Sequence, residues 1–207
     1  MKTPLHYQIS EYDCGPTTMM NAMSFLFSRE QLLPEIVQHI MLYSLDAYNA
    51  KGEIGKNGTS RVAMMFLSSW LTQFGRACHF PVVCEYLSGQ SVYLGDKSLL
   101  TQALHCNGAV IARLNYGGDH YVLLTGQEEN QVSMFDPYYR KRPFVQRDIQ
   151  LLENEPFRRN RIVTAERLNT EEKQGVYALG PIKAREAILL FNEETRLTAE
   201  KTIEYFI

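Results

Sequence analysis

The stretch around Cys14 contains the residue types that nucleophilic catalysis requires. Cys14 stands just before Gly15 and Pro16, and residues 17–27 carry apolar side chains at helical spacing. Pro16 suits a first helical turn, where its missing N–H would have no partner in any case. The spacing therefore predicts Cys14 at the start of a helix, whose free N–H groups and dipole favour the reactive thiolate. Gln8, six positions upstream, is placed to donate its amide N–H to an oxyanion beside the sulfur.

His120 and Asp136 supply the imidazole and the carboxylate that a cysteine nucleophile needs. His120 begins one predicted strand and Asp136 ends the next. If Val122 faces Met134 in this hairpin, every apolar side chain on that face has an apolar partner, and His120 faces Asp136 with the Cβ atoms about 5 Å apart. A register one residue away would split the two apolar sets between opposite faces. The pattern thus predicts that Asp136 orients His120, which acts as the base for Cys14.

The composition indicates an ordinary soluble globular protein. The chain has 207 residues, is 45% hydrophobic and carries a formal net charge of −2, which is enough to bury a core. Charges of both signs are interspersed, so nucleic acid is not indicated as a partner, and we interpret the basic clusters at 140–142 and 158–161 as solvated surface. No stretch approaches the ~18 apolar residues of a membrane span, and no signal-peptide core follows Lys2. We therefore expect a cytoplasmic protein without a membrane span.

The remaining cysteines indicate neither a disulfide framework nor a metal site. Cys78, Cys84 and Cys106 are scattered and show no Cys-x-x-Cys spacing. Gly55-Lys56 resembles part of a phosphate-binding loop, but the required glycine spacing and the Ser or Thr after the lysine are missing. The sequence therefore predicts no metal and no cofactor.

The hydrophobic pattern predicts helices first and an antiparallel sheet afterwards. Further helices are expected from about Pro34, from Thr59 or Ser60 to Phe74 with Gly75 as the terminating residue, and over 98–106, with a surface loop at 46–58. One or two short strands are expected within 77–93. A meander is then expected at 109–114, 120–125 and 131–136, with a further strand at 140–145, mixed short strands, and a C-terminal helix from about Thr198. We expect one domain over 1–150 and an extension over 151–207 that packs on it.

These motifs resemble a known family. Gln8-x5-Cys14 within Asp-Cys-Gly-Pro-Thr, Gly58-Thr59-Ser60 at a helix start, His120-Tyr-Val-Leu-Leu and Phe-Asp136-Pro are similar to the double-glycine leader peptidase domain of bacteriocin-exporting ABC transporters, over about residues 5–145. The resemblance implies an α+β, papain-like cysteine peptidase fold in which N-terminal helices carry the nucleophile and pack on an antiparallel sheet that carries His and Asp. It also implies Cys14 as nucleophile, His120 as base, Asp136 as its orienting acid and Gln8 as oxyanion donor.

The chain also departs from that family. No membrane spans and no ATPase accompany the motifs, so a stand-alone relative is expected, and we do not transfer double-glycine specificity. The predicted activity is hydrolysis of a peptide bond in a peptide or protein substrate through a thiol acyl-enzyme. The alternatives are acyl transfer to an amine on the same residues, or a relative that binds peptides without catalysis. The presence of all four residues disfavours the last, and oligomeric state is not indicated.

Overall fold

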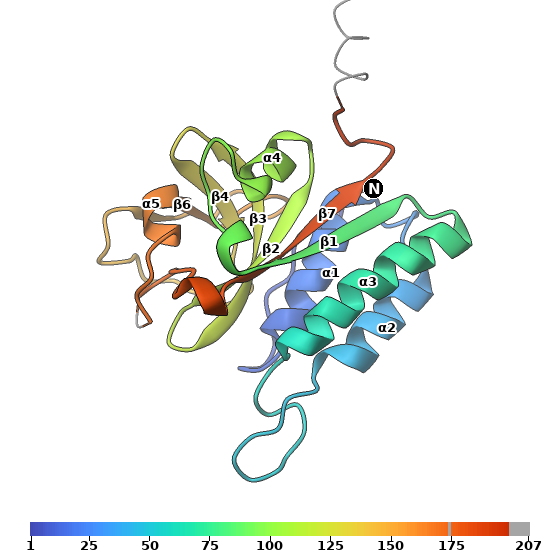
Figure 1. Cartoon of the computed structure of the whole chain (residues 1–207), viewed down its shortest axis with the longest axis horizontal. Helices are drawn as coiled ribbons and strands as arrows, with labels where there is room; N and C mark the ends of the chain where they lie inside the picture. Colours follow the sequence, from blue (N-terminus) through green and yellow to red (C-terminus); the bar gives the residue numbers. More distant parts are fainter. Residues whose placement is uncertain (174, 199–207) are drawn as a thin grey trace, which may run out of the picture.

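The computed structural model describes residues 1–173 and 175–198, which form a seven-stranded sheet with helices on both faces (Figure 1). All neighbouring strands are antiparallel, in the order β1-β7-β2-β3-β4-β6-β5. The strands are β1 (Val82–Ser88), β2 (Ala109–Asn115), β3 (Asp119–Glu128), β4 (Gln131–Phe135), β5 (Ile149–Leu151), β6 (Arg161–Thr164) and β7 (Glu186–Asn192). The predicted α+β class, with N-terminal helices against an antiparallel sheet, is confirmed.

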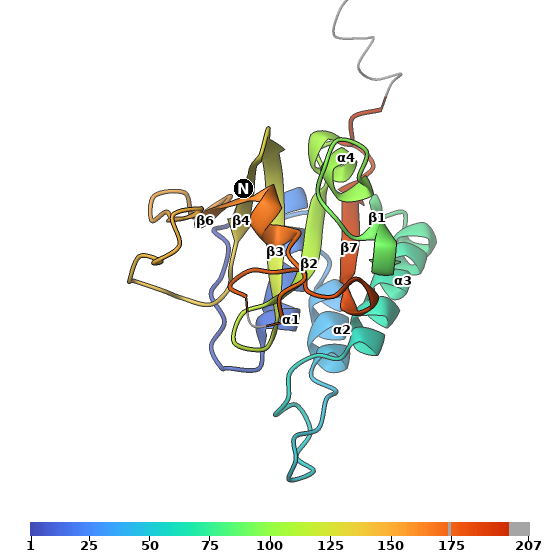
Figure 2. The same cartoon turned by 60° about the vertical axis from the view of Figure 1, so that its left-hand side comes forward.

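The helices form two unequal layers (Figures 1 and 2). One face of the sheet is covered by α1 (Cys14–Leu26), α2 (Pro34–Ser44) and α3 (Arg61–Cys78). The other face is covered by the short helices α4 (Leu99–His105) and α5 (Ala165–Leu168) together with loops. Two single 3-10 turns, Gly89–Ser91 and Ile182–Ala184, lie between these elements. Among the described residues, no helix combines the length and the apolar character needed to cross a membrane.

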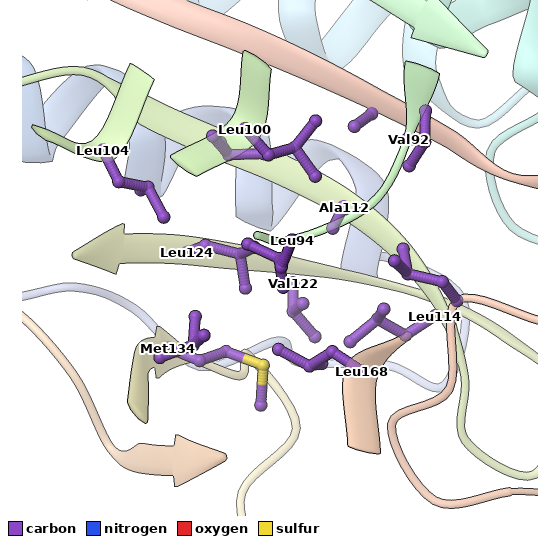
Figure 3. Close-up of a cluster of buried hydrophobic side chains, with 14 of the residues drawn as sticks. Val92, Leu94, Leu100, Leu104, Ala112, Leu114, Val122, Leu124, Met134 and Leu168 are labelled. Atoms are coloured by element: carbon purple, nitrogen blue, oxygen red, sulfur yellow. The ribbon is translucent and has the colours of Figure 1, made fainter. Parts of the chain in front are cut away.

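Alternation along the central strands divides the core into two halves. Ile111 and Leu123 pack with α1, α2 and α3, whereas Ala112 and Val122 pack with α4 and α5 (Figure 3). Because neighbouring strand residues point to opposite faces, an uninterrupted apolar run is what a strand covered on both sides requires. β7 has the same character, since all seven of its residues are buried.

Residues after 150 take part in the same sheet. β7 lies between β1 and β2, pairing Leu190 with Cys84 on one side and with Ala109 on the other. β6 pairs with β4 along the opposite half of the sheet. The segment 151–198 is thus interleaved with the elements that precede it.

The register of the β3–β4 hairpin differs from the predicted one. Leu124 pairs with Met134, two positions away from the predicted Leu124–Val132 pair. The turn is shorter than expected, with Glu129 in the left-handed region at φ 51°, and a bulge between Leu124 and Gly126 shifts the pairing by one further residue near the turn. A shift of two residues keeps every side chain on its predicted face.

Two further expectations about local structure are wrong. Gly75 does not end α3, which continues to Cys78 and closes with His79 in the left-handed region. A Cβ on Gly75 would lie 2.7 Å from the carbonyl oxygens of both Phe80 and Val82, so this glycine permits the returning chain to approach the helix. Residues 140–145 form no strand, and the predicted helix from about Thr198 falls on residues outside the described range.

Candidate active site

Gln8, Cys14 and His120 line one open cavity of about 890 Å³. Its walls come from the N-terminus of α1, the residues that lead into α3, the β2–β3 turn and the segment after β4. Asp136 lies behind His120 and is fully buried. The structure therefore brings together all four residues that the sequence analysis singled out, although they come from four separate segments.

Cys14 is the first residue of α1 and is buried. The hydroxyl of Thr18, one turn further along the helix, donates to the backbone carbonyl of Tyr121 at 3.0 Å in the buried interior. Because Tyr121 directly follows His120 on β3, this hydrogen bond fixes the start of α1 against the strand that carries the imidazole. The sulfur and the ring are thereby held as neighbours by backbone elements.

Gln8 is held beside Cys14 by its own backbone and by the turn that separates the two residues. Its N–H donates to the Pro137 carbonyl at 2.9 Å, and the Asp13 carboxylate accepts backbone hydrogen bonds from Ile9 and Ser10. The side-chain Nε2 of Gln8 donates to the Ser10 carbonyl at 2.8 Å, which leaves one of its two N–H groups for another acceptor. Its role as an oxyanion donor stays a prediction.

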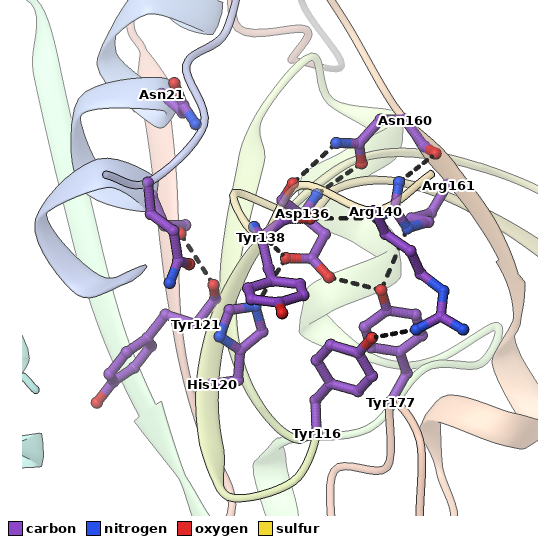
Figure 4. A network of polar contacts seen from close by, with 12 residues as sticks. Asn21, Tyr116, His120, Tyr121, Asp136, Tyr138, Arg140, Asn160, Arg161 and Tyr177 are labelled. Atoms are coloured by element: carbon purple, nitrogen blue, oxygen red, sulfur yellow. Dashed lines mark hydrogen bonds and ion pairs between the residues drawn. The ribbon is translucent and has the colours of Figure 1, made fainter. Parts of the chain in front are cut away.

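The His120 ring is bonded to Asp136 through a defined nitrogen. His120 Nε2 lies 2.7 Å from Asp136 Oδ1 (Figure 4). Nδ1 is therefore the ring nitrogen that remains to face Cys14. The contact exists although the register differs from the predicted one, because the shift by two residues leaves both groups within side-chain reach.

The Asp136 carboxylate is held by more donors than the sequence suggested. Oδ1 also accepts the Tyr138 N–H at 2.7 Å, and Oδ2 accepts the Tyr177 hydroxyl at 2.5 Å. The Asn160 side chain pairs with the backbone of Asp136, accepting its N–H and donating to its carbonyl, both at 2.8 Å. Behind Tyr177, the buried Arg161 donates Nε to the tyrosine hydroxyl at 3.2 Å (Figure 4).

Charge–charge contacts dominate the protonation of this pair. Burial lowers the pKa of His120, but the charge and hydrogen bond of Asp136 and the contact with the Cys14 sulfur outweigh it and raise the pKa to about 10. Burial raises the pKa of Asp136, but the His120 charge, the hydrogen bonds from His120 and Tyr177, and the Arg161 charge hold it below its usual value. An imidazolium ion paired with the Asp136 carboxylate is the form that these contacts favour at neutral pH.

The raised pKa of His120 predicts how stability depends on pH. An unfolded histidine titrates near ~6.5, so the stabilisation from protonated His120 is complete below that pH and is lost as pH rises through about 10. We expect the melting temperature of the wild-type protein to fall progressively between pH 7 and pH 10. The His120→Gln variant should show a smaller decline in differential scanning calorimetry. Parallel curves for the two proteins would contradict the assignment.

Sequence reasoning did not identify Tyr177, Arg161 or Asn160. Tyr177 reaches Asp136 through a backbone bridge, in which its N–H donates to the Asn115 carbonyl at 2.9 Å. It has φ 61°, a strained conformation for a bulky residue that often accompanies functional sites. No local pattern announces such a conformation. The sequence does contain one indication of a role for Arg161, because it is a charged residue at the start of an apolar strand. Its basic neighbours favoured its interpretation as surface.

Thr59 packs against the residue that follows the nucleophile. A Cβ on Gly15 would lie 2.3 Å from Thr59 Oγ1 and 2.6 Å from Thr59 Cβ. Contacts this short are not tolerated. The Gly58-Thr59-Ser60 motif therefore has a physical reason, because it closes the cavity wall directly on the start of α1.

We expect Gly15→Ala to destabilise the protein by about 1–3 kcal/mol, because the new methyl group overpacks this contact. Urea unfolding followed by circular dichroism measures the change. Thr59→Gly removes the opposing side chain and should recover part of the loss in the Gly15→Ala background. Equal effects of Gly15→Ala in both backgrounds would show that the two residues do not interact.

A second buried carboxylate lies under the cavity. Glu186 accepts hydrogen bonds from Arg61 Nε at 2.7 Å, Tyr86 at 2.6 Å and Tyr121 at 2.5 Å. Arg113 is ion-paired with Asp119 and lies 3.7 Å from Glu186. Two arginines of the cavity wall thus have acidic partners within the protein.

The other cysteines lie away from this site. Cys78 is exposed at the end of α3, Cys84 is in β1, and Cys106 follows α4. In the described part of the chain, no three or more His, Cys, Asp or Glu side chains come together in a way that would hold a metal ion.

Comparison with known proteins gives two similar structures. No family model and no curated protein matches the sequence. The chain is similar to a double-glycine motif protease from an AMS/PCAT transporter, solved in complex with the leader peptide, at 10% identity and a TM-score of 0.43, covering 91% of this chain and 89% of that one. It is also similar to the peptidase domain of Streptococcus mutans ComA at 14% identity and a TM-score of 0.40, covering 91% and 98% respectively.

Proposed function

We propose that this protein is a thiol peptidase that cleaves a peptide bond through an acyl-enzyme on Cys14. The observation that carries the proposal is the position of the His120 ring, which lines the same cavity as Cys14 and bonds to Asp136 at 2.7 Å. A nucleophile, a base and a group that orients the base are the parts that covalent acyl transfer requires. They meet at a cavity wide enough for a peptide.

Each residue has a defined part in the proposed reaction. The Cys14 thiolate attacks the carbonyl carbon of the scissile bond, and the negative charge moves to the carbonyl oxygen. The free N–H of Gln8 and the backbone N–H of Cys14 stabilise this oxyanion, each contributing about 3 kcal/mol. The C–N bond then breaks as His120 gives its proton to the leaving amine, which leaves a thioester on Cys14.

Hydrolysis of the thioester returns the protein to its starting state. His120, now neutral, accepts a proton from water as the water oxygen attacks the thioester carbonyl. The C–S bond breaks, the product leaves as a carboxylic acid, and the thiolate–imidazolium pair is restored. Asp136 keeps Nε2 protonated throughout, so that Nδ1 is always the nitrogen that exchanges the proton.

The test is cleavage of a diverse mixture of synthetic fourteen-residue peptides, read by mass spectrometry. We expect new termini with the wild-type protein and none with Cys14→Ala, whose fold is checked by circular dichroism. Added glycine methyl ester separates hydrolysis from acyl transfer, because a transferase would give products that carry the amine. A protein with fast Cys14 alkylation and no cleavage would contradict peptidase activity and indicate a peptide-binding relative.

A further inference from the structure

Arg140 turns its side chain toward the active-site cavity instead of into solvent. It was interpreted from the sequence as part of a solvated basic cluster, yet it is half-buried and lines the same cavity as Cys14 and His120. Its neighbours Lys141 and Arg142 are exposed and do not line the cavity. One member of the cluster is therefore set apart by its position.

The guanidinium of Arg140 is fixed in place by uncharged groups. Nε donates to the Arg142 carbonyl at 2.7 Å, Nη1 to the Tyr116 hydroxyl at 3.1 Å, and Nη2 to the Pro143 carbonyl at 3.5 Å. Its carbon centre lies 4.3 Å from the centroid of the Phe144 ring. Ordering a long side chain in this way costs conformational entropy, and it prepares the group for a ligand.

Arg140 differs from the other cavity arginines in its charge balance. Arg61 and Arg113 have carboxylate partners in Glu186 and Asp119. Within the described residues, no carboxylate forms an ion pair with Arg140. Arg161 also lies 5.6 Å from the Phe144 ring, but it is buried outside the cavity wall and is linked to Asp136 through Tyr177.

The remaining donors of Arg140 suit a carboxylate. A guanidinium has five N–H groups, and three of them are used, which leaves two, one on each terminal nitrogen. Paired N–H groups on adjacent nitrogens match the two oxygens of a carboxylate. The Tyr116 side chain spans the gap to the base, since its ring centroid lies 5.8 Å from that of His120 and its hydroxyl accepts from Arg140 (Figure 4).

We propose that Arg140 recognises a carboxylate of the peptide substrate, and this inference rests on the function proposed above. An extended peptide advances ~3.4 Å per residue, so the carboxylate belongs to a residue about two or three positions from the scissile bond. It is either an acidic side chain or the carboxyl terminus of a short peptide. The chemistry is the same in both cases, and the experiment separates them.

The test measures binding, so that it does not depend on cleavage. The full chain carrying Cys14→Ala is titrated into eight-residue peptides of Ala and Gln labelled with a neutral fluorophore, and anisotropy is recorded. One series carries a single Glu at each position in turn with an amidated terminus. The parent peptide is made with amidated and with free carboxyl termini. We expect about tenfold tighter binding for one or two Glu positions or for the free terminus.

Variants assign the preference to Arg140. Arg140→Gln in the Cys14→Ala background should remove the preference, and Arg140→Lys should keep only part of it, because lysine offers charge without the paired donors. Arg142→Gln is the matched control, since only its backbone carbonyl contacts Arg140. Thermal melting verifies that each variant is folded.

The outcomes separate this inference from the proposed function. Lack of any carboxylate preference, a preference that survives Arg140→Gln, or lack of binding by every peptide overturns the role of Arg140. Cleavage by the wild-type protein without a carboxylate preference refutes this inference and leaves the peptidase intact. A preference that depends on Arg140, with no cleavage of the diverse peptide mixture by the wild-type protein, supports the site and refutes the peptidase.

Discussion

Replacing His120 by alanine is expected to slow alkylation of Cys14 by iodoacetamide about 10- to 100-fold at pH 6. An ordinary cysteine with a pKa near ~8.5 is only about 0.3% thiolate at this pH. In the folded protein, His120 has its pKa raised to about 10, with Cys14 among the causes, so the ring is protonated at pH 6 and can stabilise negative charge that develops on the sulfur. The lower intrinsic nucleophilicity of a stabilised thiolate offsets part of the gain. Peptide cleavage should fall by ~10³-fold or more, because base and acid are both lost.

Mass spectrometry of the alkylated protein between pH 5 and pH 9 gives the rate profile. His105→Ala is the control, since His105 is an exposed histidine at the end of α4. Its profile should match that of the wild-type protein. Profiles that rise near pH ~8.5 in both wild type and His120→Ala would identify Cys14 as an ordinary thiol and remove the basis of the peptidase proposal.

Asp136→Asn is expected to lower the free energy of unfolding by about 3–5 kcal/mol, although the asparagine side chain has almost the same shape as aspartate. The carboxylate is fully buried and is the charge that balances His120 and, through Tyr177, the buried Arg161. Removing one partner leaves buried positive charge without compensation, which is far more costly than losing an exposed ion pair. Cleavage should fall by ~10³- to 10⁴-fold, because the amide no longer holds Nε2 protonated.

Tyr177→Phe provides the graded comparison. It removes one donor to Asp136 and one acceptor for Arg161 but leaves the charges in place, so a loss of about 1–3 kcal/mol is expected. Urea unfolding at pH 7 compares both variants with the wild type. Asp136→Asn within ~1 kcal/mol of the wild type would show that the carboxylate is not ionised in the folded protein.

The sequence predicted the meander and the helix that starts at Cys14 because both depend on local periodicity. The hairpin register was wrong by two residues, and yet the faces were right, since the parity of a strand survives such a shift. The turn at Glu129 and the bulge near Gly126 cannot be read from apolar alternation. The prediction that His120 contacts Asp136 therefore depended only on both side chains being on the same face of the hairpin. The residue-by-residue pairing was not predicted.

What the sequence could not show depends on contacts between distant segments. Tyr177 reaches Asp136 only because residues 175–180 fold back along the end of β2. Gly75 was expected to end a helix, but its role is to admit the carbonyls of Phe80 and Val82. Arg140 was assigned to the surface, and its orientation toward the cavity follows from Tyr116 and Phe144. Apolar periodicity predicts none of these contacts.

The location of β7 between β1 and β2 has a consequence for biosynthesis. β1 is an edge strand whose neighbour is β7, and Ile188 and Leu190 complete the core beneath the long helices. α1 and α3 are synthesised long before these residues. The helices therefore lack part of their packing surface until β7, more than a hundred residues after Cys14, has been made. Such long-range pairing is slow to form. The part of the core that β7 contributes is therefore expected to form late, after α1 and α3 have been synthesised.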